Sequence, residues 1–126
     1  MTGKCTKTKH THAAKVGGYK DVQSEAAMAA ALAIGPLSVA IEADKSIFQS
    51  YKKGVIKGKT CGKQLDHGVL AVGMGTEAGT QYWKVKNSWG ASWGMEGYVL
   101  LARGTDECGI ADGPPSYPTG VTAPSM

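Results

Sequence analysis

The order of apolar and polar positions predicts one helix in the first third of the chain. Ser24 is a favourable N-cap, Glu25 complements the positive end of a helix, and residues 26–34 are an almost unbroken run of alanine. Gly35 and Pro36 end the run, because glycine suits a left-handed cap and proline cannot continue the helical hydrogen bonds. We therefore expect one main helix here.

After this helix the pattern becomes that of short strands. Residues 37–42 alternate apolar side chains with small or polar ones, as a half-buried strand does. Strand patterns recur at 67–72, 81–86 and 98–102, and residues 75–80 suit a hairpin connection. The predicted fold class is α+β, with the helix leading into an antiparallel sheet or small barrel.

Both ends of the chain are predicted to be extended and exposed. Residues 1–20 are polar and basic, and His10 and His12 have no neighbouring cysteine or acidic residue that would complete a metal site. From Gly113 onward the chain holds four of its five prolines, which favour an extended path along the surface.

Composition narrows the class of protein. The chain has 126 residues with 18 glycines and one phenylalanine, which favours a loop-rich globular domain over a helical bundle. Its net charge of +4 comes largely from lysines in residues 4–15 and 52–63. These lysines are not interleaved with aromatic residues, so a solvated basic face is favoured over an anion-binding patch and no nucleic-acid partner is expected. No run reaches the ~18 apolar residues of a membrane span, and no signal peptide is visible.

His67 and Asn87 are the candidate catalytic pair. His67 begins an apolar strand after a glycine-rich loop, and Asn87 ends another strand just before Ser88 and Trp89. A histidine that exchanges protons with a nucleophile needs a partner on its other ring nitrogen, and an asparagine oxygen can be that partner. Taken alone, the two residues are better explained as a sheet histidine with satisfied hydrogen bonds and a turn asparagine bonded to its own backbone than as a catalytic pair.

Two longer stretches resemble a known family. Residues 61–75, CGKQLDHGVLAVGMG, are similar to the segment around the catalytic histidine of papain-like cysteine peptidases. Residues 82–98, YWKVKNSWGASWGMEGY, are similar to the segment around their catalytic asparagine. The resemblance extends through residues 35–43 and 108–118, in the order and spacing of the family, and covers about residues 17–118.

The resemblance implies a fold and three roles. The fold would be the C-terminal, right-hand domain of the papain fold, a barrel-like antiparallel sheet with one main helix and short helical turns. Residues 1–16 would be an exposed lead-in left from the interdomain region, and residues 17–126 would form the domain. His67 would be the catalytic imidazole, Asn87 would orient it, and Trp89 would shield their hydrogen bond from water.

The resemblance also implies a substrate pocket and a disulfide. The positions that match the family's main specificity pocket are Ala40, Leu65, Gly68 and Gly113. Their small or apolar side chains would favour a bulky hydrophobic substrate residue next to the scissile one. Cys61 and Cys108 match a family disulfide. No metal or cofactor is implied.

The nucleophile of the family has no match in this sequence. In the family it lies in a Gly-Ser-Cys-Trp context at the start of a long helix, whereas Cys5 lies in Gly-Lys-Cys-Thr-Lys with no helical pattern after it. Cys5 matches instead a cysteine that pairs with the N-terminal domain, which leaves an odd cysteine in this chain.

Two functions remain open at this stage. The first is one part of a cysteine peptidase, inactive without an N-terminal half that carries the nucleophile. The second is a non-catalytic module that binds peptides or inhibitors. The expected partners are a peptide or protein substrate, the missing N-terminal domain and protein inhibitors of cysteine peptidases. The family implies a lysosomal, vacuolar or extracellular location.

Overall fold

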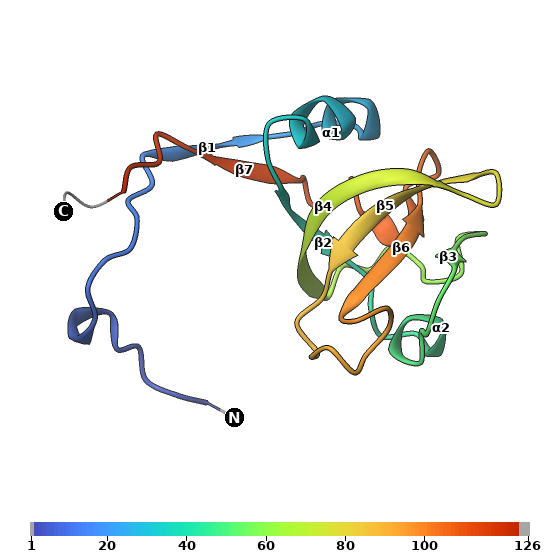
Figure 1. The fold of residues 1–126 in the computed structure, drawn as a ribbon, viewed down its shortest axis with the longest axis horizontal. Helices are drawn as coiled ribbons and strands as arrows, with labels where there is room; N and C mark the ends of the chain where they lie inside the picture. The colour runs from blue at the N-terminus through green and yellow to red at the C-terminus, as the bar shows by residue number, and fades with distance from the viewer. Residues whose placement is uncertain (1, 124–126) are drawn as a thin grey trace.

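A computed structural model of the chain describes residues 2–123. Its helical elements are η1 (Lys7–Lys9), α1 (Glu25–Leu32), α2 (Ser46–Gln49) and η2 (Glu107–Gly109). Its strands are β1 (Gly18–Asp21), β2 (Leu37–Ile41), β3 (Val55–Ile56), β4 (His67–Glu77), β5 (Thr80–Lys86), β6 (Tyr98–Ala102) and β7 (Ser116–Thr119). Figure 1 shows a body built around β4, β5 and β6, from which β1 and β7 project.

The strands form one seven-stranded sheet in the order β1-β7-β2-β4-β5-β6-β3. Every pair in it is antiparallel except β3 with β6. The predicted α+β class with a mainly antiparallel sheet is therefore confirmed. The sheet curls without closing into a barrel, because its order begins at β1 and ends at β3 and these two strands do not pair.

Helix α1 begins as its sequence predicts and ends earlier than the alanine run. The Ser24 Oγ accepts a hydrogen bond from the Ala27 backbone N–H at 3.1 Å, which is an N-cap contact. The last helical residue is Leu32, and the backbone N–H of Gly35 donates to the Ala31 carbonyl. Met28 is the buried residue of the helix, since most alanines on its other faces meet solvent.

The core lies on one face of β2, β4, β5 and β6. In β2 the side chains of Leu37, Val39 and Ile41 are buried, whereas Ser38 is exposed and Ala40 is half-buried. This alternation is the one that the sequence predicts for a half-buried strand. Next to the candidate catalytic pair, the outward face of β2 and β4 therefore carries the small residues Ser38, Ala40 and Gly68.

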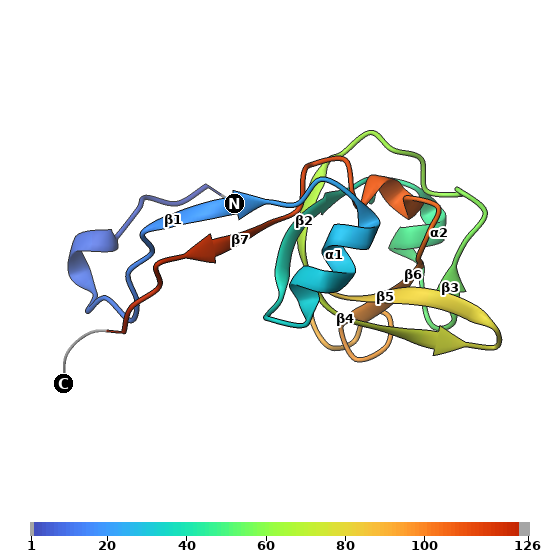
Figure 2. The same cartoon turned by 90° about the horizontal axis from the view of Figure 1, so that it is seen from above.

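Strands β1 and β7 form a two-stranded arm that sequence patterns did not reveal. Their register joins Gly18 to Thr119 and Asp21 to Ser116, so residues 18–20, which were predicted to be extended and exposed, are part of a mostly exposed strand. Figures 1 and 2 show the arm extending away from the body, with the N-terminal segment beyond it. Residues 2–17 are exposed. The arm exists because two distant segments pair, and neither has a strong strand pattern alone.

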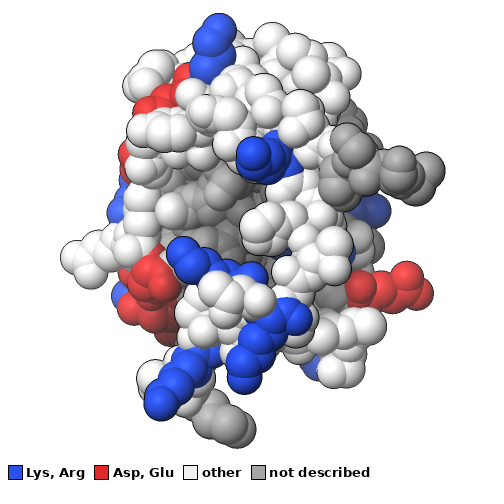
Figure 3. Space-filling view, turned by 90° about the vertical axis from the view of Figure 1, so that its left-hand side faces the viewer, with Lys and Arg blue, Asp and Glu red and all other residues white. Residues whose placement is uncertain are grey.

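Basic side chains gather on the face seen in Figure 3, with acidic side chains on both sides of them.

Within residues 2–123, the helices are all too short or too polar to cross a bilayer.

Candidate active site

The hairpin of β4 and β5 brings His67 and Asn87 together. Leu70 of β4 pairs with Lys86 of β5, so the start of β4 and the end of β5 lie at the same end of the hairpin. His67 is the first residue of β4, and Asn87 directly follows β5. Their separation of twenty positions along the chain therefore follows from the length of the hairpin, and antiparallel pairing brings the two residues into contact.

A hydrogen bond joins the two side chains. The His67 Nε2 lies 2.8 Å from the Asn87 Oδ1. The backbone N–H of Ser88 also donates to this Asn87 atom, at 2.8 Å. A backbone N–H requires an acceptor, so the shared atom is the amide oxygen and the His67 Nε2 carries the hydrogen. The Nδ1 of His67 is left free to exchange a proton with another group.

Asn87 is held firmly enough to fix this geometry. It is 7% exposed, and its backbone N–H donates to the Gly97 carbonyl at 3.0 Å. His67 itself is only half-buried. One side of the pair is therefore anchored in the protein, while the imidazole can be reached from outside.

An aromatic cluster surrounds the imidazole. The Trp89 ring lies over the His67 ring with centroids 5.1 Å apart and planes inclined by 31°. Phe48 of α2 is fully buried and meets Trp89 edge to face at 5.5 Å. Trp93 packs on Phe48 at 5.0 Å, and its Nε1 donates to the Gln49 carbonyl at 3.0 Å. Trp93 thus packs against α2, and Trp89 lies next to the histidine.

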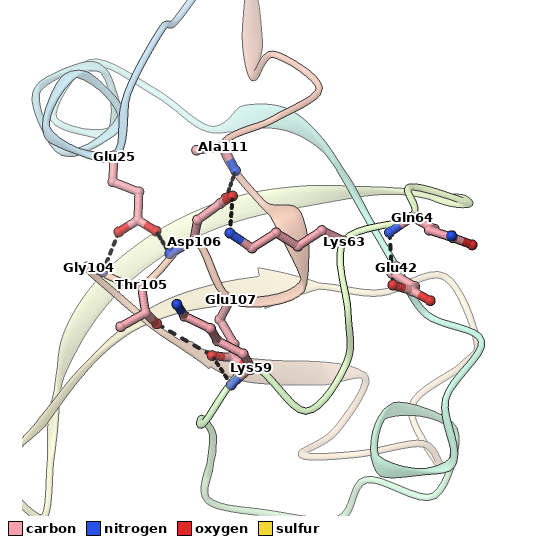
Figure 4. Close-up of polar contacts among 10 residues, drawn as sticks. All are labelled: Glu25, Glu42, Lys59, Lys63, Gln64, Gly104, Thr105, Asp106, Glu107 and Ala111. Carbon is pink, nitrogen blue, oxygen red and sulfur yellow. Dashed lines mark hydrogen bonds and ion pairs between the residues drawn. The ribbon is translucent and has the colours of Figure 1, made fainter.

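The loop before His67 is fastened by the disulfide between Cys61 and Cys108, whose Cα atoms are 5.0 Å apart. The predicted disulfide is confirmed. Beside it, the carboxylate of the fully buried Glu107 accepts a hydrogen bond from the backbone N–H of Lys59 at 3.0 Å (Figure 4) and another from that of Thr60 at 3.1 Å. The loop is therefore attached to η2 by one covalent and two hydrogen-bonded contacts.

The four predicted pocket positions lie close together. Ala40 pairs with Gly68 across β2 and β4. A Cβ atom added at Gly113 would lie 3.4 Å from the Ala40 Cβ and 4.0 Å from a Leu65 methyl carbon. An open hollow of about 380 Å³ continues from Gly68 along the same outward face; it is lined by Ser38, Gly68, Val69, Leu70, Lys86, Asn87 and Ser88.

The remaining candidates for chemistry lie elsewhere. Cys5 is a free, exposed cysteine in the N-terminal segment, outside the body that carries His67 (Figure 1). Cys61, Cys108 and Glu107 lie close enough to resemble a metal site. The sulfurs of Cys61 and Cys108 are joined in the disulfide, so they are not thiolate ligands.

Sequence reasoning missed three residues that shape this site. Phe48, Glu42 and Glu107 are all buried next to it. The strand alternation even predicts that Glu42 faces outward with Ser38 and Ala40, but β2 ends at Ile41 and the chain turns. A charged residue directly after an apolar strand was the only available signal.

Comparison with known proteins gives a consistent picture. The family model described as papain family cysteine protease matches residues 1–119. A probable cysteine protease of Arabidopsis thaliana, RDL2, is 48% identical over 125 residues, which are 94% of this chain and 34% of that protein. Digestive cysteine proteinase 3 of Homarus americanus is 54% identical over 106 residues, which are 81% of this chain and 33% of that protein. The chain thus spans about a third of these relatives.

Solved structures agree with the sequence comparison. The bromelain protease from Ananas comosus, in complex with the inhibitor E64, has a TM-score of 0.83 and 41% identity. The match covers 93% of this chain and 56% of that one. The Carica candamarcensis cysteine protease CMS1MS2, in complex with E-64, has a TM-score of 0.74 and 37% identity, and the match covers 83% of this chain and 49% of that one.

Proposed function

The chain belongs to the papain family of cysteine proteases, and on that basis we propose that it supplies the histidine and asparagine wall of a cysteine peptidase active site. A second half that carries the nucleophilic cysteine would form the other wall. The observation that supports this role most directly is the hydrogen bond between His67 Nε2 and Asn87 Oδ1. It fixes the tautomer that leaves Nδ1 available to a thiol.

In this proposal His67 moves the protons of peptide hydrolysis. Its Nδ1 accepts the thiol proton, and the resulting thiolate attacks the carbonyl carbon of the scissile peptide bond. The imidazolium then donates that proton to the leaving amine nitrogen, which breaks the carbon–nitrogen bond and leaves a thioester. A water molecule, deprotonated by the same nitrogen, hydrolyses the thioester and restores the thiol. Asn87 keeps the ring oriented throughout, and Trp89 limits access of water to their hydrogen bond.

The pocket residues would select the substrate. Ala40, Gly68 and Gly113 present little side-chain bulk, and Leu65 adds an apolar wall that is 37% exposed. A wall of this kind accommodates a large hydrophobic side chain and gives a charged one no partner. We therefore propose peptides with a bulky hydrophobic residue before the scissile one as substrates.

Exposed apolar side chains would help to bind the complementary half. Tyr19 on the arm is 73% exposed, and Ile34 after α1 is 85% exposed. Apolar side chains this exposed favour contact with another surface. Two of the chain's structural neighbours were solved with E64 or E-64 bound, so small and protein inhibitors of cysteine proteases are proposed ligands of the completed site. A lysosomal, vacuolar or extracellular location stays a prediction.

Hydrolysis assays test the proposal. The purified chain is mixed with a fluorogenic peptide that has a hydrophobic residue before arginine, at mildly acidic pH with a reducing agent. We expect no turnover from the chain alone, and turnover after it is combined with the cysteine-bearing N-terminal half of the bromelain protease. His67→Ala should abolish that turnover, whereas His10→Ala, an exposed histidine in the N-terminal segment, should not change it.

Two results would contradict the proposal. One is turnover by the chain alone that survives the His67→Ala substitution. The other is a stable complex with the complementary half that binds E-64 without hydrolysing the peptide. The latter would favour the alternative function, a module that binds peptides or inhibitors without catalysis.

A further inference from the structure

Glu42 is a buried carboxylate that the proposed chemistry does not use. It directly follows β2 and is 2% exposed. Its Oε2 accepts a hydrogen bond from the backbone N–H of Gln64 at 2.8 Å, and its Oε1 lies 3.3 Å from the Lys45 Nζ. Its own backbone N–H donates to the Cys108 carbonyl at 2.9 Å. Glu42 thus connects the end of β2, the disulfide and the loop before His67, and Figure 4 shows its contact with Gln64.

Burial of a carboxylate is unfavourable unless partners replace its water. At Glu42 the replacement is well matched, because each carboxylate oxygen has its own donor. The Gln64 N–H is the main cause that lowers the pKa of Glu42, and Asp44 and Lys45 add to the effect against the opposing influence of burial. Glu42 is therefore charged at neutral pH, and its bond to Gln64 is a charge-assisted one.

The segment that Glu42 holds leads directly into the site. Gln64 is followed by Leu65, Asp66 and His67. Asp66 is itself fixed to the residues on either side of Glu42: its N–H donates to the Ile41 carbonyl at 2.9 Å, and its Oδ1 accepts from the Ala43 N–H at 2.8 Å. Residues 41–43 therefore make three hydrogen bonds to residues 64–66, and only the one from Glu42 uses a side chain of that strand end.

The fit around the carboxylate is tight on its other side. Gly62 has a φ of +76°, and a Cβ atom there would collide with the Glu42 carboxylate. The loop backbone thus passes directly against the acid, so a change in the acid is transmitted to the loop.

We propose that Glu42 is a positioning residue that sets the place of Leu65 and the approach to His67 by holding the Gln64 backbone. This inference rests on the proposed function for its effect on substrates. Its effect on the loop can be measured on the chain alone.

The first test uses nuclear magnetic resonance on the full chain. In Glu42→Leu we expect amide exchange of Gln64 and Asp66 to become at least about tenfold faster, since a bond to a charged acceptor is lost. The His67 ring nitrogen shifts should move away from those of the Nε2–H tautomer. Glu42→Gln keeps an acceptor oxygen and should restore most of both signals. Glu77→Gln, at the exposed far end of β4, removes a carboxylate without touching Glu42 or Gln64 and is the matched control.

Two outcomes overturn the proposal. In one, Gln64 exchange and the His67 shifts stay as in the unsubstituted chain. In the other, amides of the buried strand residues Val85 and Val99 accelerate as much as Gln64, which would mean that Glu42 only stabilises the whole fold.

The second test uses the peptidase reconstituted with its complementary half. Glu42→Leu should reduce the ratio of kcat/KM for a peptide with phenylalanine before the scissile residue to that for a peptide with alanine there, and Glu42→Gln should restore the ratio. An unchanged ratio overturns the effect on Leu65. If the reconstituted protein hydrolyses neither peptide, the proposed function fails, and the resonance experiment still decides the role of Glu42.

Discussion

Phe48→Ala is expected to destabilise the chain strongly. Phe48 is the only phenylalanine and is fully buried. Its ring contacts Trp89 at 5.5 Å, Trp93 at 5.0 Å and the His67 ring at 6.5 Å between centroids. Its helix α2 has four residues and no side-chain N-cap, so the burial of Phe48 and the hydrogen bond from Trp93 to the Gln49 carbonyl fix it to the body.

The magnitude follows from burial and the cavity left behind. Truncation of a buried phenylalanine to alanine costs about 3–5 kcal/mol. A domain of this size has a total unfolding free energy of about 5–15 kcal/mol, so this single change removes a large part of it. With a urea m-value of about 2 kcal/mol/M, the midpoint should fall by roughly 2 M.

The assay is urea unfolding followed by tryptophan fluorescence, with near-ultraviolet circular dichroism to report the aromatic cluster. Ile47→Ala is the matched control, because Ile47 is the neighbouring residue of the same helix and is 45% exposed. The Ile47→Ala substitution should lower the unfolding free energy by less than about 1 kcal/mol. A Phe48→Ala loss as small as that of the control would refute the argument that this ring anchors α2 beneath Trp89 and His67.

Three further predictions concern the loop before His67. Replacing Cys61 and Cys108 by serine should lower the unfolding free energy by about 4 kcal/mol in the chain-entropy model, since the disulfide closes a loop of 47 residues. An unchanged midpoint of guanidinium unfolding would contradict this prediction. Hydrogen bonding lowers the pKa of Glu42 in the folded chain below its usual value of 4.5. The ionised Glu42 therefore stabilises the fold fully above pH 4.5, and this stabilisation is lost as the pH falls through the lower pKa of the folded state. Thermal melts of the chain and of Glu42→Gln should therefore converge on acidification, and parallel curves would be evidence against the effect. Gly62→Ala should cost about 1–3 kcal/mol from left-handed strain plus collision with the carboxylate. Gly54→Ala, with a similar φ of +83° and no atom within 4 Å of the added Cβ, should show the strain alone; equal losses in calorimetry would remove the collision from the account.

The sequence by itself determined the elements and the chemical pair. Ser24 caps the start of α1, whereas the left-handed cap expected at Gly35 is not formed and the helix ends at Leu32. Strand patterns predict segments within β2, β4, β5 and β6, and the alternation in β2 also predicts its buried face. His67 and Asn87 could be singled out because their surroundings form continuous motifs. Their contact also follows from the sequence once β4 and β5 form a hairpin, because antiparallel register depends on turn length and strand length.

Only the tertiary structure decided what supports the pair. Glu42 reaches Gln64 across 22 residues, Glu107 reaches Lys59 across 48, and the arm pairs β1 with β7 from opposite ends of the chain. The partners of both acids are backbone N–H groups, which every residue except proline carries. A donor of that kind leaves no mark in the sequence, so the burial of a carboxylate beside it is visible only after the chain has folded.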